Sequence, residues 1–507
     1  MVANQRKIGV ILTYISEIIR ILTYLIYTPV MLHLLGQSEY GLYQLVHSVV
    51  AYLSLLSLGF TASYVRFFSR YKANGQEDEI SRLNGMFLTV FLVIALIAVL
   101  CGSIMTLNIE GIFRTGLTAD EYDTARILMM LMVFNLALTF PASVFTCITT
   151  AYEKFFFQRL LLVLRNLLNP FLTLPLLIMG YGSIAMVIVT TVITLASLIS
   201  NIWFACFKLH VKFVFKGFDF SLLKEIWNFT FFIFLNQIID QVNWSVDRFL
   251  LGRIMGTAAV AVYSLGAQIN SMYIMLSTSV SSVFVPRVNR IVAETNDNDK
   301  LSSIFNNVGR IQFIILSLVM TGFIFLGKPF IRFWGGRGYE DAYFVALWLI
   351  IPATVPLIQN LGVEIQRAKN KHKARTIVYL CISFTNILLS IPLIQRYGPI
   401  GAAIGTAIAL FAGNILFMNW YYHKHIGINI LSFWKNIFSF IPALIPSVIV
   451  GILIMKYAPV NNLLHLIGWA VVYGIVFCIS MWFFGMNQSE KNIVIHAKNK
   501  ILRRKRK

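Results

Sequence analysis

The chain has 507 residues, of which 58% are hydrophobic and only 12% are charged. Soluble domains carry about 25% charged residues, so this composition excludes an ordinary soluble enzyme. It predicts an all-α integral membrane protein, because helices satisfy their own backbone hydrogen bonds in lipid.

Apolar runs long enough to cross a bilayer, which takes about 20 residues, recur along the whole chain. We predict fourteen transmembrane helices from them. Their approximate ranges are 9–35, 41–65, 85–107, 127–151, 158–179, 183–207, 225–252, 258–285, 305–327, 342–366, 376–395, 399–422, 435–457 and 463–484.

The formal net charge of +21 could suggest a nucleic-acid partner, but its distribution indicates a membrane topology. With the N-terminus placed inside, the inside segments hold 32 of the 42 Lys and Arg residues and the outside segments hold eight. Short cytoplasmic loops show this bias. Both termini are therefore predicted to be cytoplasmic, and no nucleic-acid partner is expected.

Landmarks that recur at one nearly constant offset along the chain predict an internal repeat. In each half an Asn precedes a Pro by six residues and a Tyr-Gly pair follows, at Asn169, Pro175 and Tyr181-Gly182 and at Asn386, Pro392 and Tyr397-Gly398. Leu35-Gly36 and Leu251-Gly252 are expected to end spans one and seven at nearly the same offset. Each repeat holds six spans, an even number, so the halves should form a parallel repeat with substrate bound between them.

The predicted architecture is therefore two parallel six-helix bundles around a central cavity plus an extra helix pair. We place the N-terminal bundle at 1–210, the C-terminal bundle at 211–428, the extra pair at 429–485 and a basic cytoplasmic tail at 486–507. The extra pair carries few polar residues in its interior and should largely face lipid. The tail either lies on the inner leaflet, attracted by anionic lipid, or is a frayed basic end.

A stripe of polar residues runs along span seven. Asn236, Asp240, Asn243 and Asp247 are spaced by four, three and four residues, so they share one face of a helix. An ionisable group at mid-bilayer costs roughly 2.5–3.5 kcal/mol even on permissive scales. The stripe should therefore line a wet cavity, which is typical of a transporter.

Span one supplies Glu17 and Arg20 near mid-bilayer, spaced so that they can pair. The candidate substrate-binding residues are Arg20, Arg66, Arg165, Arg248, Trp244, Asn236 and Asn243, and the candidate ion-coupling residues are Asp240, Glu17 and Asp247. All of these except Asn236, Asn243 and Asp240 have a plainer alternative. Glu17 and Arg20 would form a structural ion pair, Arg66 and Arg165 would anchor span ends at the interface, Asp247 and Arg248 would cap the outer interface, and Trp244 would be an interfacial anchor.

Motifs for other chemistry are absent or broken. Residues 322–328 match the first seven positions of a phosphate-binding loop, but Pro329 stands where Ser or Thr should ligate magnesium, and the match lies in an apolar span. The five cysteines have no metal-type spacing. We expect no catalytic residues, no metal and no cofactor.

Two stretches of the chain form recognisable motifs. The first is Leu34-Leu35-Gly36-Gln37-Ser38-Glu39-Tyr40-Gly41-Leu42-Tyr43-Gln44, with Leu58-Gly59-Phe60 and Arg66-Phe67 after it. The second is Asp247-Arg248-Phe249-Leu250-Leu251-Gly252, followed by Gly256 and Tyr263-Ser264. The first resembles the start of bacterial oligosaccharide flippases, the O-antigen-type polysaccharide transporters of the multidrug/oligosaccharidyl-lipid/polysaccharide exporter superfamily, and the second is similar to the start of that family's second half. Lipid II flippases and spore-coat or teichuronic-type exporters share this plan.

The resemblance implies that an undecaprenyl-diphosphate-linked oligosaccharide moves from the inner to the outer leaflet by alternating access, for surface polysaccharide synthesis. It implies a bacterial inner membrane protein, coupling to a Na⁺ or H⁺ gradient, and cavity arginines that meet the diphosphate. Guanidinium groups suit phosphate because they offer paired donors and stay charged. We expect Arg20 to contact the diphosphate, and Asp240, with Glu17, to carry the coupling. Membrane lipid and polysaccharide polymerase or chain-length machinery are the further partners expected.

Two other functions stay open. A multidrug or cation antiporter of the same superfamily usually has twelve spans and would favour acids and aromatics over a mid-membrane arginine. A membrane glycosyltransferase or polymerase would need a catalytic outside loop, and the longest outside loop here covers only about 108–126.

Overall fold

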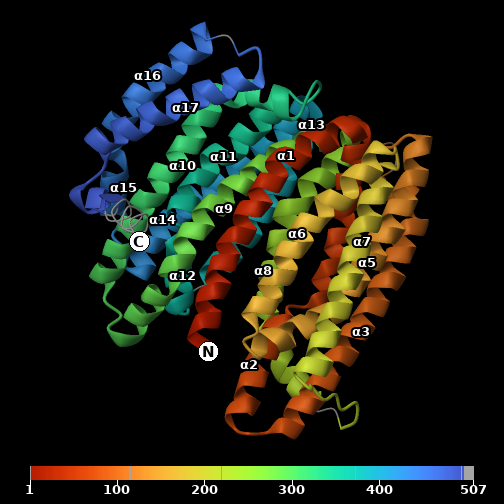
Figure 1. Ribbon diagram of the computed structural model, residues 1–507. Helices are drawn as coiled ribbons and strands as arrows, with labels where there is room; N and C mark the ends of the chain where they lie inside the picture. Colours follow the sequence, from red (N-terminus) through yellow and green to blue (C-terminus); the bar gives the residue numbers. More distant parts are fainter. Residues whose placement is uncertain are drawn as a thin grey trace, which may run out of the picture. The chain divides into compact units, whose positions relative to one another are not determined.

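The computed structural model describes residues 2–113, 116–217, 220–371, 373–458, 460–492 and 494–495, and it describes their side chains except at 2–18, 62, 220, 228–229, 232, 244 and 373. The described residues form helices joined by short loops, without a strand among them (Figure 1). Their contacts divide the chain into two units. Unit 1 comprises Met1–Ser264 with Ile394–Gly398, and unit 2 comprises Leu265–Leu393 with Pro399–Lys507.

Unit 1 contains the helices of the first half of the chain and one more. In chain order these are α1 (Val2–Val50), the 3₁₀ segment η1 (Ala51–Ser57), α2 (Phe60–Ala73), α3 (Glu77–Leu107), α4 (Ile109–Phe113), α5 (Ala119–Ala151), α6 (Phe155–Ile178), α7 (Gly182–Trp203), the π-helical η2 (Phe204–Lys208) and α8 (Phe220–Met255). The next helix, α9 (Thr257–Glu294), begins in unit 1 and continues into unit 2.

Unit 2 contains the rest of the chain. Its helices are α10 (Asn298–Trp334), α11 (Ala342–Ile358), α12 (Asn360–Ala368), α13 (Lys373–Leu410), η3 (Phe411–Phe417), α14 (Met418–Tyr421), η4 (Tyr422–Ile426), α15 (Ile430–Phe438), α16 (Ile441–Tyr457), α17 (Leu463–Ser480) and η5 (Met481–Gly485). The segments η3, η4 and η5 are π-helical.

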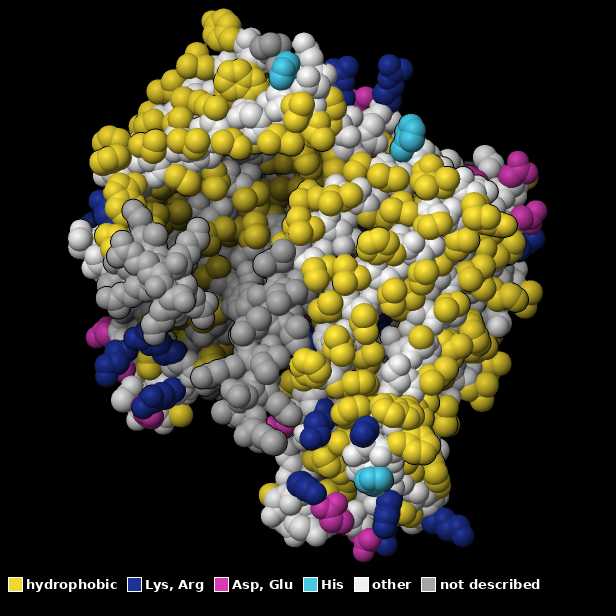
Figure 2. Space-filling model, viewed as in Figure 1, with side chains coloured by type: hydrophobic (Ala, Val, Ile, Leu, Met, Phe, Trp, Pro, Cys, Tyr) yellow, Lys and Arg dark blue, Asp and Glu magenta, His cyan; other side chains and the backbone are white. Residues whose placement is uncertain are grey.

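The protein is a multi-pass membrane protein. Nine helices within the described ranges are long and apolar enough to cross a bilayer, and the number rises to eleven if each of two bent pairs, α11 with α12 and α15 with α16, is one span. The surface of unit 1 is also typical of a membrane protein. Hydrophobic side chains cover the middle of α3, α5, α6 and α7, and charged side chains gather at the lower end of the unit (Figure 2). The count of fourteen spans and their grouping into two six-helix bundles stay predictions, as do the predicted domain boundaries.

Two long helices are each interrupted by a single glycine. Gly36 in α1 has φ 75° and Gly398 in α13 has φ 59°. Residues with a side chain rarely adopt this left-handed region, so each glycine ends one helical stretch and starts the next. The breaks fall where the sequence predicts the loop between spans one and two and the loop between spans eleven and twelve.

The prediction that Leu251-Gly252 ends span seven is wrong. Helix α8 continues to Met255, and the chain turns at Gly256, where φ is 87°. Gly252 has a packing role instead, because a Cβ atom there would lie 2.4 Å from Cδ1 of Leu45. The glycine at this landmark is therefore needed for close contact between α8 and α1, and not for a turn.

The predicted repeat has a structural counterpart in the hydrogen bonds of two asparagines. The side-chain amide of Asn169 donates to the Thr190 hydroxyl at 3.2 Å, and Thr173 donates to Asn169 at 3.4 Å. In unit 2, Asn386 accepts from Ser390 at 3.1 Å and from Thr406 at 3.3 Å. In both places an asparagine binds the residue four positions later and a threonine on the next helical stretch, which supports the repeat.

The last two long helices, α16 and α17, pack on α10 (Figure 1). Gly451 of α16 lies against the Phe325 ring, and Tyr473 of α17 contacts the same ring at a centroid distance of 6.0 Å. Their other faces carry many exposed large aliphatic side chains, as expected for helices that face lipid.

Candidate functional site

The four residues of the polar stripe on α8 differ in their solvent exposure. Asp240 is exposed, Asn236 and Asn243 are half-buried, and Asp247 is only 1% exposed. All four side chains take part in polar or electrostatic interactions within the protein. The charged group nearest the middle of the helix is thus the one that remains accessible.

Helix α8 runs antiparallel to the chain from Gly41 to Gly59. Gly59 packs against Ile233, Leu45 packs against Gly252, and Gly41 meets the backbone carbonyl of Thr257 just beyond the helix. Because these contacts follow α8 along most of its length, the stripe is carried on a helix held firmly by α1, η1 and α2.

Asp247 accepts a 2.7 Å hydrogen bond from the Tyr263 hydroxyl in the interior of unit 1. This bond ties α8 to α9, since both residues are buried. The neighbouring Arg248 is half-buried, and its charge acts on Tyr40 and His47 of α1. The buried hydrogen bond to Tyr263 indicates that Asp247 positions α8. Asp240 is therefore the stronger candidate for ion coupling.

The predicted arginines lie on three helices of unit 1. Arg20 is half-buried on α1, whereas Arg66 on α2 and Arg165 on α6 are exposed. The Arg66 guanidinium lies 6.0 Å from the Phe67 ring centroid, within the range of a cation–π contact. The side chains of Glu17 and Trp244 lie outside the described residues, so the Glu17–Arg20 pair and sugar stacking on Trp244 stay predictions.

The segment that carries the first resemblance has a structural role that sequence reasoning missed. Glu39 accepts a 2.6 Å hydrogen bond from the Ser183 N–H, so its carboxylate caps the N-terminus of α7. The adjacent Ser38 donates to Oε1 of Glu121 at 2.5 Å. Ser38 and Glu39 thus connect helix ends within unit 1. Nothing in the sequence indicated these contacts except that both residues belong to the first resembling stretch.

Three buried polar residues of α9 in unit 2, Tyr273, Ser277 and Ser281, form hydrogen bonds with neighbouring helices. Ser277 donates to the Leu357 carbonyl at 2.7 Å and Tyr273 bonds the Thr354 hydroxyl at 2.8 Å. Asn360 of α12 donates to Ser281 at 3.0 Å. Hydrogen bonds of this kind hold membrane helices together, so these polar side chains need no cavity to explain them.

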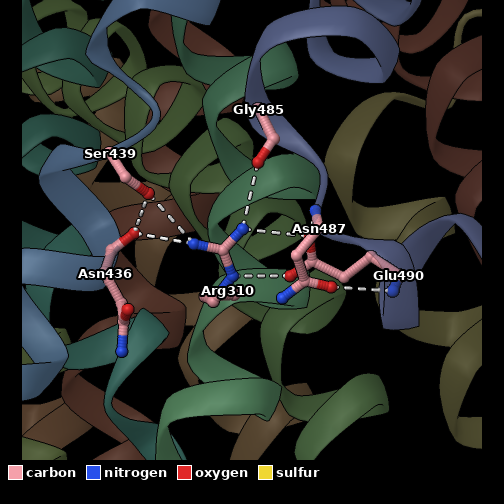
Figure 3. Close-up of polar contacts among 6 residues, drawn as sticks. All are labelled: Arg310, Asn436, Ser439, Gly485, Asn487 and Glu490. Carbon is pink, nitrogen blue, oxygen red and sulfur yellow. Dashed lines mark hydrogen bonds and ion pairs between the residues drawn. The ribbon is translucent and has the colours of Figure 1, made fainter.

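Sequence reasoning also missed the buried ion pair between Arg310 of α10 and Glu490, whose side chains are 7% and 8% exposed (Figure 3). Nε and Nη2 of Arg310 donate to the two carboxylate oxygens at 2.6 and 3.0 Å. The same guanidinium donates to the carbonyls of Asn436 and Gly485 and to the Ser439 hydroxyl. The sequence signal was that Glu490 is the lone acid after residue 485.

Arg310 therefore forms hydrogen bonds with both the beginning and the end of the extra helix pair. Asn436 and Ser439 lie where α15 leads into α16, and Gly485 ends η5. The Phe440 ring lies 4.3 Å from the guanidinium carbon and covers it. Asn487 and Glu490 also exchange backbone-to-side-chain hydrogen bonds, at 2.8 and 2.9 Å, which fixes the carboxylate.

Among the described residues no group of three His, Cys, Asp or Glu side chains could hold a metal ion. The half-buried Arg20 lies on α1 before the break at Gly36, whereas the close contacts of α8 involve residues 41–59 after it. The site therefore consists of a polar face of α8 with an accessible carboxylate. Such a surface can bind a polar or charged solute within an apolar protein, and it holds no recognisable nucleophile–base pair.

Comparison of the sequence with known proteins identifies the family of this chain. Residues 7–292 match the model of a family described as polysaccharide biosynthesis protein. An uncharacterized membrane protein EpsK of Bacillus subtilis is 22% identical over 480 residues, which cover 92% of this chain and 93% of EpsK. A putative O-antigen transporter of Shigella flexneri is 21% identical over 398 residues, which cover 77% of this chain and 91% of that protein.

Solved structures share the fold. Lipid II flippase MurJ in an inward closed conformation has a TM-score of 0.71 at 19% identity, covering 94% of this chain and 98% of MurJ. An inward-facing multidrug resistance MATE family transporter of the MOP superfamily has a TM-score of 0.67 at 14% identity, covering 83% of this chain and 99% of its own. The family match extends over more than half of the sequence, and the chain therefore belongs to the polysaccharide biosynthesis protein family, as the two resembling stretches predicted.

Proposed function

We propose that this protein is a transporter that flips a lipid-linked oligosaccharide across the bacterial inner membrane, from the cytoplasmic to the outer leaflet. The cargo is an undecaprenyl-diphosphate-linked oligosaccharide destined for surface polysaccharide. The cycle is alternating access driven by a Na⁺ or H⁺ gradient, and both termini are cytoplasmic.

The single observation that carries the proposal is the exposed carboxylate of Asp240 within the 36-residue helix α8. A charge on a membrane helix that faced lipid would cost several kcal/mol (roughly 2.5–3.5 on insertion scales), so the face that carries it has to meet water or a polar solute. The family and the relative named O-antigen transporter support a polysaccharide precursor as that solute.

The chemistry of such a cargo fits the residues. The prenyl chain can stay in hydrocarbon while the diphosphate and sugars cannot, so the protein need only shield the head group. Arg20 would pair with the diphosphate, Asn236 and Asn243 would bind sugar hydroxyls, and Asp240 would take up the coupling ion. Arg66, Arg165 and Arg248 are further candidates for the diphosphate. Polymerase or chain-length machinery would receive the product.

The test is reconstitution of the full chain in proteoliposomes with undecaprenyl-diphosphate bearing a fluorescent N-acetylglucosamine. A membrane-impermeant quencher reports how fast the label changes leaflet. We expect flipping that exceeds empty liposomes at least tenfold and that responds to an imposed Na⁺ or H⁺ gradient. Flipping no faster than in empty liposomes, together with normal surface polysaccharide in a deletion strain, would refute the proposal.

A cation or multidrug antiporter is the second candidate. It is favoured by the acidic groups of α8 and by the fold shared with a multidrug resistance MATE family transporter. Under that function a deletion strain would become sensitive to cationic drugs while its surface polysaccharide stayed normal, which is the opposite of the result expected for a flippase.

A further inference from the structure

One carboxylate joins three helix ends in unit 1. Oε1 of Glu121, at the start of α5, accepts hydrogen bonds from Ser38 of α1 at 2.5 Å and from Thr257 of α9 at 2.8 Å. Its Oε2 accepts the Thr118 N–H at 2.9 Å. The hydroxyl oxygens of Ser38 and Thr257 lie 2.9 Å from each other. We call Ser38, Glu121 and Thr257 the carboxylate latch.

Glycines let the backbones meet beside the latch. A Cβ atom on Gly41 would lie 1.9 Å from the Thr257 carbonyl oxygen, and one on Gly116 would lie 2.0 Å from the Gly252 carbonyl oxygen. No side chain other than hydrogen fits at either position. The two backbones are therefore in close contact at these positions.

The latch links the two halves of the repeat. Gly41 and Thr257 are separated by the same offset as Gly182 and Gly398, two landmarks of the repeat, so equivalent points of the two halves touch here. Helix α9 starts at Thr257 and crosses the boundary between the units after Ser264. A bond that holds Thr257 against α1 and α5 thus holds the start of the helix that enters unit 2.

The latch is less buried than the pair of Arg310 and Glu490. Ser38 is exposed and Glu121 is half-buried, so water can replace the hydrogen bond between them when it breaks, whereas Thr257 is buried with 6% exposure. Arg310 and Glu490 are almost fully buried, and separating them would leave two buried charges without a partner. Water can therefore compensate for loss of the Glu121 hydrogen bonds more easily than for loss of the buried ion pair.

We propose that Glu121 is a positioning residue of the transport cycle: it closes the end of unit 1 where α1, α5 and α9 meet, and Ser38 and Thr257 must move apart for cargo to leave at that end. This inference rests on the proposed flippase function. Under the predicted topology this end faces the outside, so the latch is closed while the carrier takes up cargo from the cytoplasmic leaflet.

A disulfide across the latch tests whether it must open. In the full chain with its five native cysteines replaced by alanine, Ser38→Cys with Thr257→Cys places two thiols where hydroxyl oxygens now lie 2.9 Å apart, within reach of a disulfide. Oxidation should reduce flipping of the fluorescent undecaprenyl-diphosphate sugar at least tenfold, and reductant should restore it. Each single cysteine variant, oxidised in the same way, should keep its rate.

Two results would overturn the proposal. One is fully cross-linked protein that flips at the reduced rate. The other is a failure of the two thiols to cross-link in proteoliposomes, because the latch geometry would then not exist in the membrane.

A second measurement needs no cargo, so it separates failure of the latch from failure of the flippase function. Gln44→Cys, which is half-buried and lies six residues beyond Ser38 on α1, reports labelling by an impermeant maleimide added from outside. Glu121→Ala should raise the labelling rate about tenfold. Glu121→Gln should raise it less than threefold, because the amide can donate to both hydroxyls while its oxygen still accepts the Thr118 N–H.

Equal labelling rates in the parent, Glu121→Ala and Glu121→Gln proteins would contradict the latch even if flipping is observed. Conversely, the expected labelling pattern without flipping of the sugar probe would support the latch and would refute the proposal that the cargo is an undecaprenyl-diphosphate-linked oligosaccharide.

Discussion

Gly182 and Gly398 have nearly the same positive φ, 60° and 59°, although they lie in different halves of the repeat. Each starts the small-residue helical stretch of its half. Their surroundings differ, because Gly182 lies under the Glu39 carboxylate and Gly398 lies 3.3 Å, measured from an added Cβ, from the Met255 sulfur. Glu39 and Met255 are themselves equivalent positions, separated by the same offset as the two glycines, so a charged cap in the first half corresponds to an apolar contact in the second.

This difference makes the two glycines a matched pair for substitution. Alanine is strained at either position, because residues with a side chain rarely adopt a positive φ. At Gly182 the new methyl would also displace Glu39, since the Cβ would lie 2.2 Å from Oε1, and the α7 cap would be lost. We expect Gly182→Ala to lower the Tm of the detergent-purified protein clearly more than Gly398→Ala, whose neighbour is a flexible methionine. Equal losses would contradict the capping role of Glu39.

Replacing Asp240 by Asn should abolish ion dependence while leaving the fold intact. The side chain is exposed, so little packing is lost, but the neutral amide cannot take up a proton and binds Na⁺ weakly. The response of flipping to an imposed Na⁺ or H⁺ gradient should disappear. Asp247→Asn is the control, because Asp247 is buried against Tyr263 and should affect Tm more than coupling. A gradient response unchanged in Asp240→Asn would exclude Asp240 as the coupling residue.

Replacing Arg20 tests contact with the diphosphate. Arg20→Ala should reduce flipping by one to two orders of magnitude with normal membrane levels, since charge-assisted bidentate bonds are the strong ones. Arg20→Lys keeps the charge but loses the paired donors, so an intermediate rate is expected. Arg82→Ala, which removes an exposed arginine of α3 outside the proposed site, serves as the control and should keep the parent rate. Full polysaccharide export in cells carrying Arg20→Ala would refute the assignment.

Breaking the pair of Arg310 and Glu490 should destabilise unit 2 without a direct effect on cargo. Removing one partner of a buried ion pair costs about 3–5 kcal/mol, because the other charge is left buried. Glu490→Gln should therefore lower the Tm and expose the C-terminal segment to protease. The surface pair of Arg290 and Glu294, whose side chains are 75% and 57% exposed, offers a control in Glu294→Gln that should change neither. Unaltered stability of Glu490→Gln would show that the buried pair does not hold the extra helices.

The carboxylate latch lies ahead of the apolar run of α5 and should withstand mild acid. Burial acts to raise the pKa of Glu121, but hydrogen bonds from Ser38, the Thr118 N–H and Thr257 outweigh it, and the pKa lies below the usual value of 4.5. The nearby Arg126 is paired with Glu110 and Asp123, and Glu39 is engaged at Ser183. A depressed carboxyl pKa gives stability that is complete above the usual pKa and is lost as the pH falls through the lower value.

The measurement is the difference in Tm between wild type and Glu121→Gln. It should be constant from pH 8 to about pH 5.5 and should vanish only below about pH 4. A difference that disappears between pH 7 and pH 6 would mean that the hydrogen bonds do not hold the charged form, contrary to the latch geometry.

The sequence alone determined the membrane class, the family and the polar face of α8, because each depends on composition or on local spacing. Apolar runs of about 20 residues must become helices in lipid, and residues spaced by three and four positions share a helix face whatever the helix packs against. The repeat was readable for the same reason, since Asn169 and Asn386 recur at a fixed offset and form matching hydrogen bonds.

Only the tertiary structure decided which polar residues are accessible and which are structural. Asp240 and Asp247 are indistinguishable by spacing, yet one is exposed and the other is buried against Tyr263. Glu121 meets Ser38 and Thr257, and Arg310 meets Glu490, across 83, 136 and 180 residues of chain. Contacts at such separations depend on which helices pack together, and helix packing is set by the complementary shapes of many side chains rather than by any local pattern.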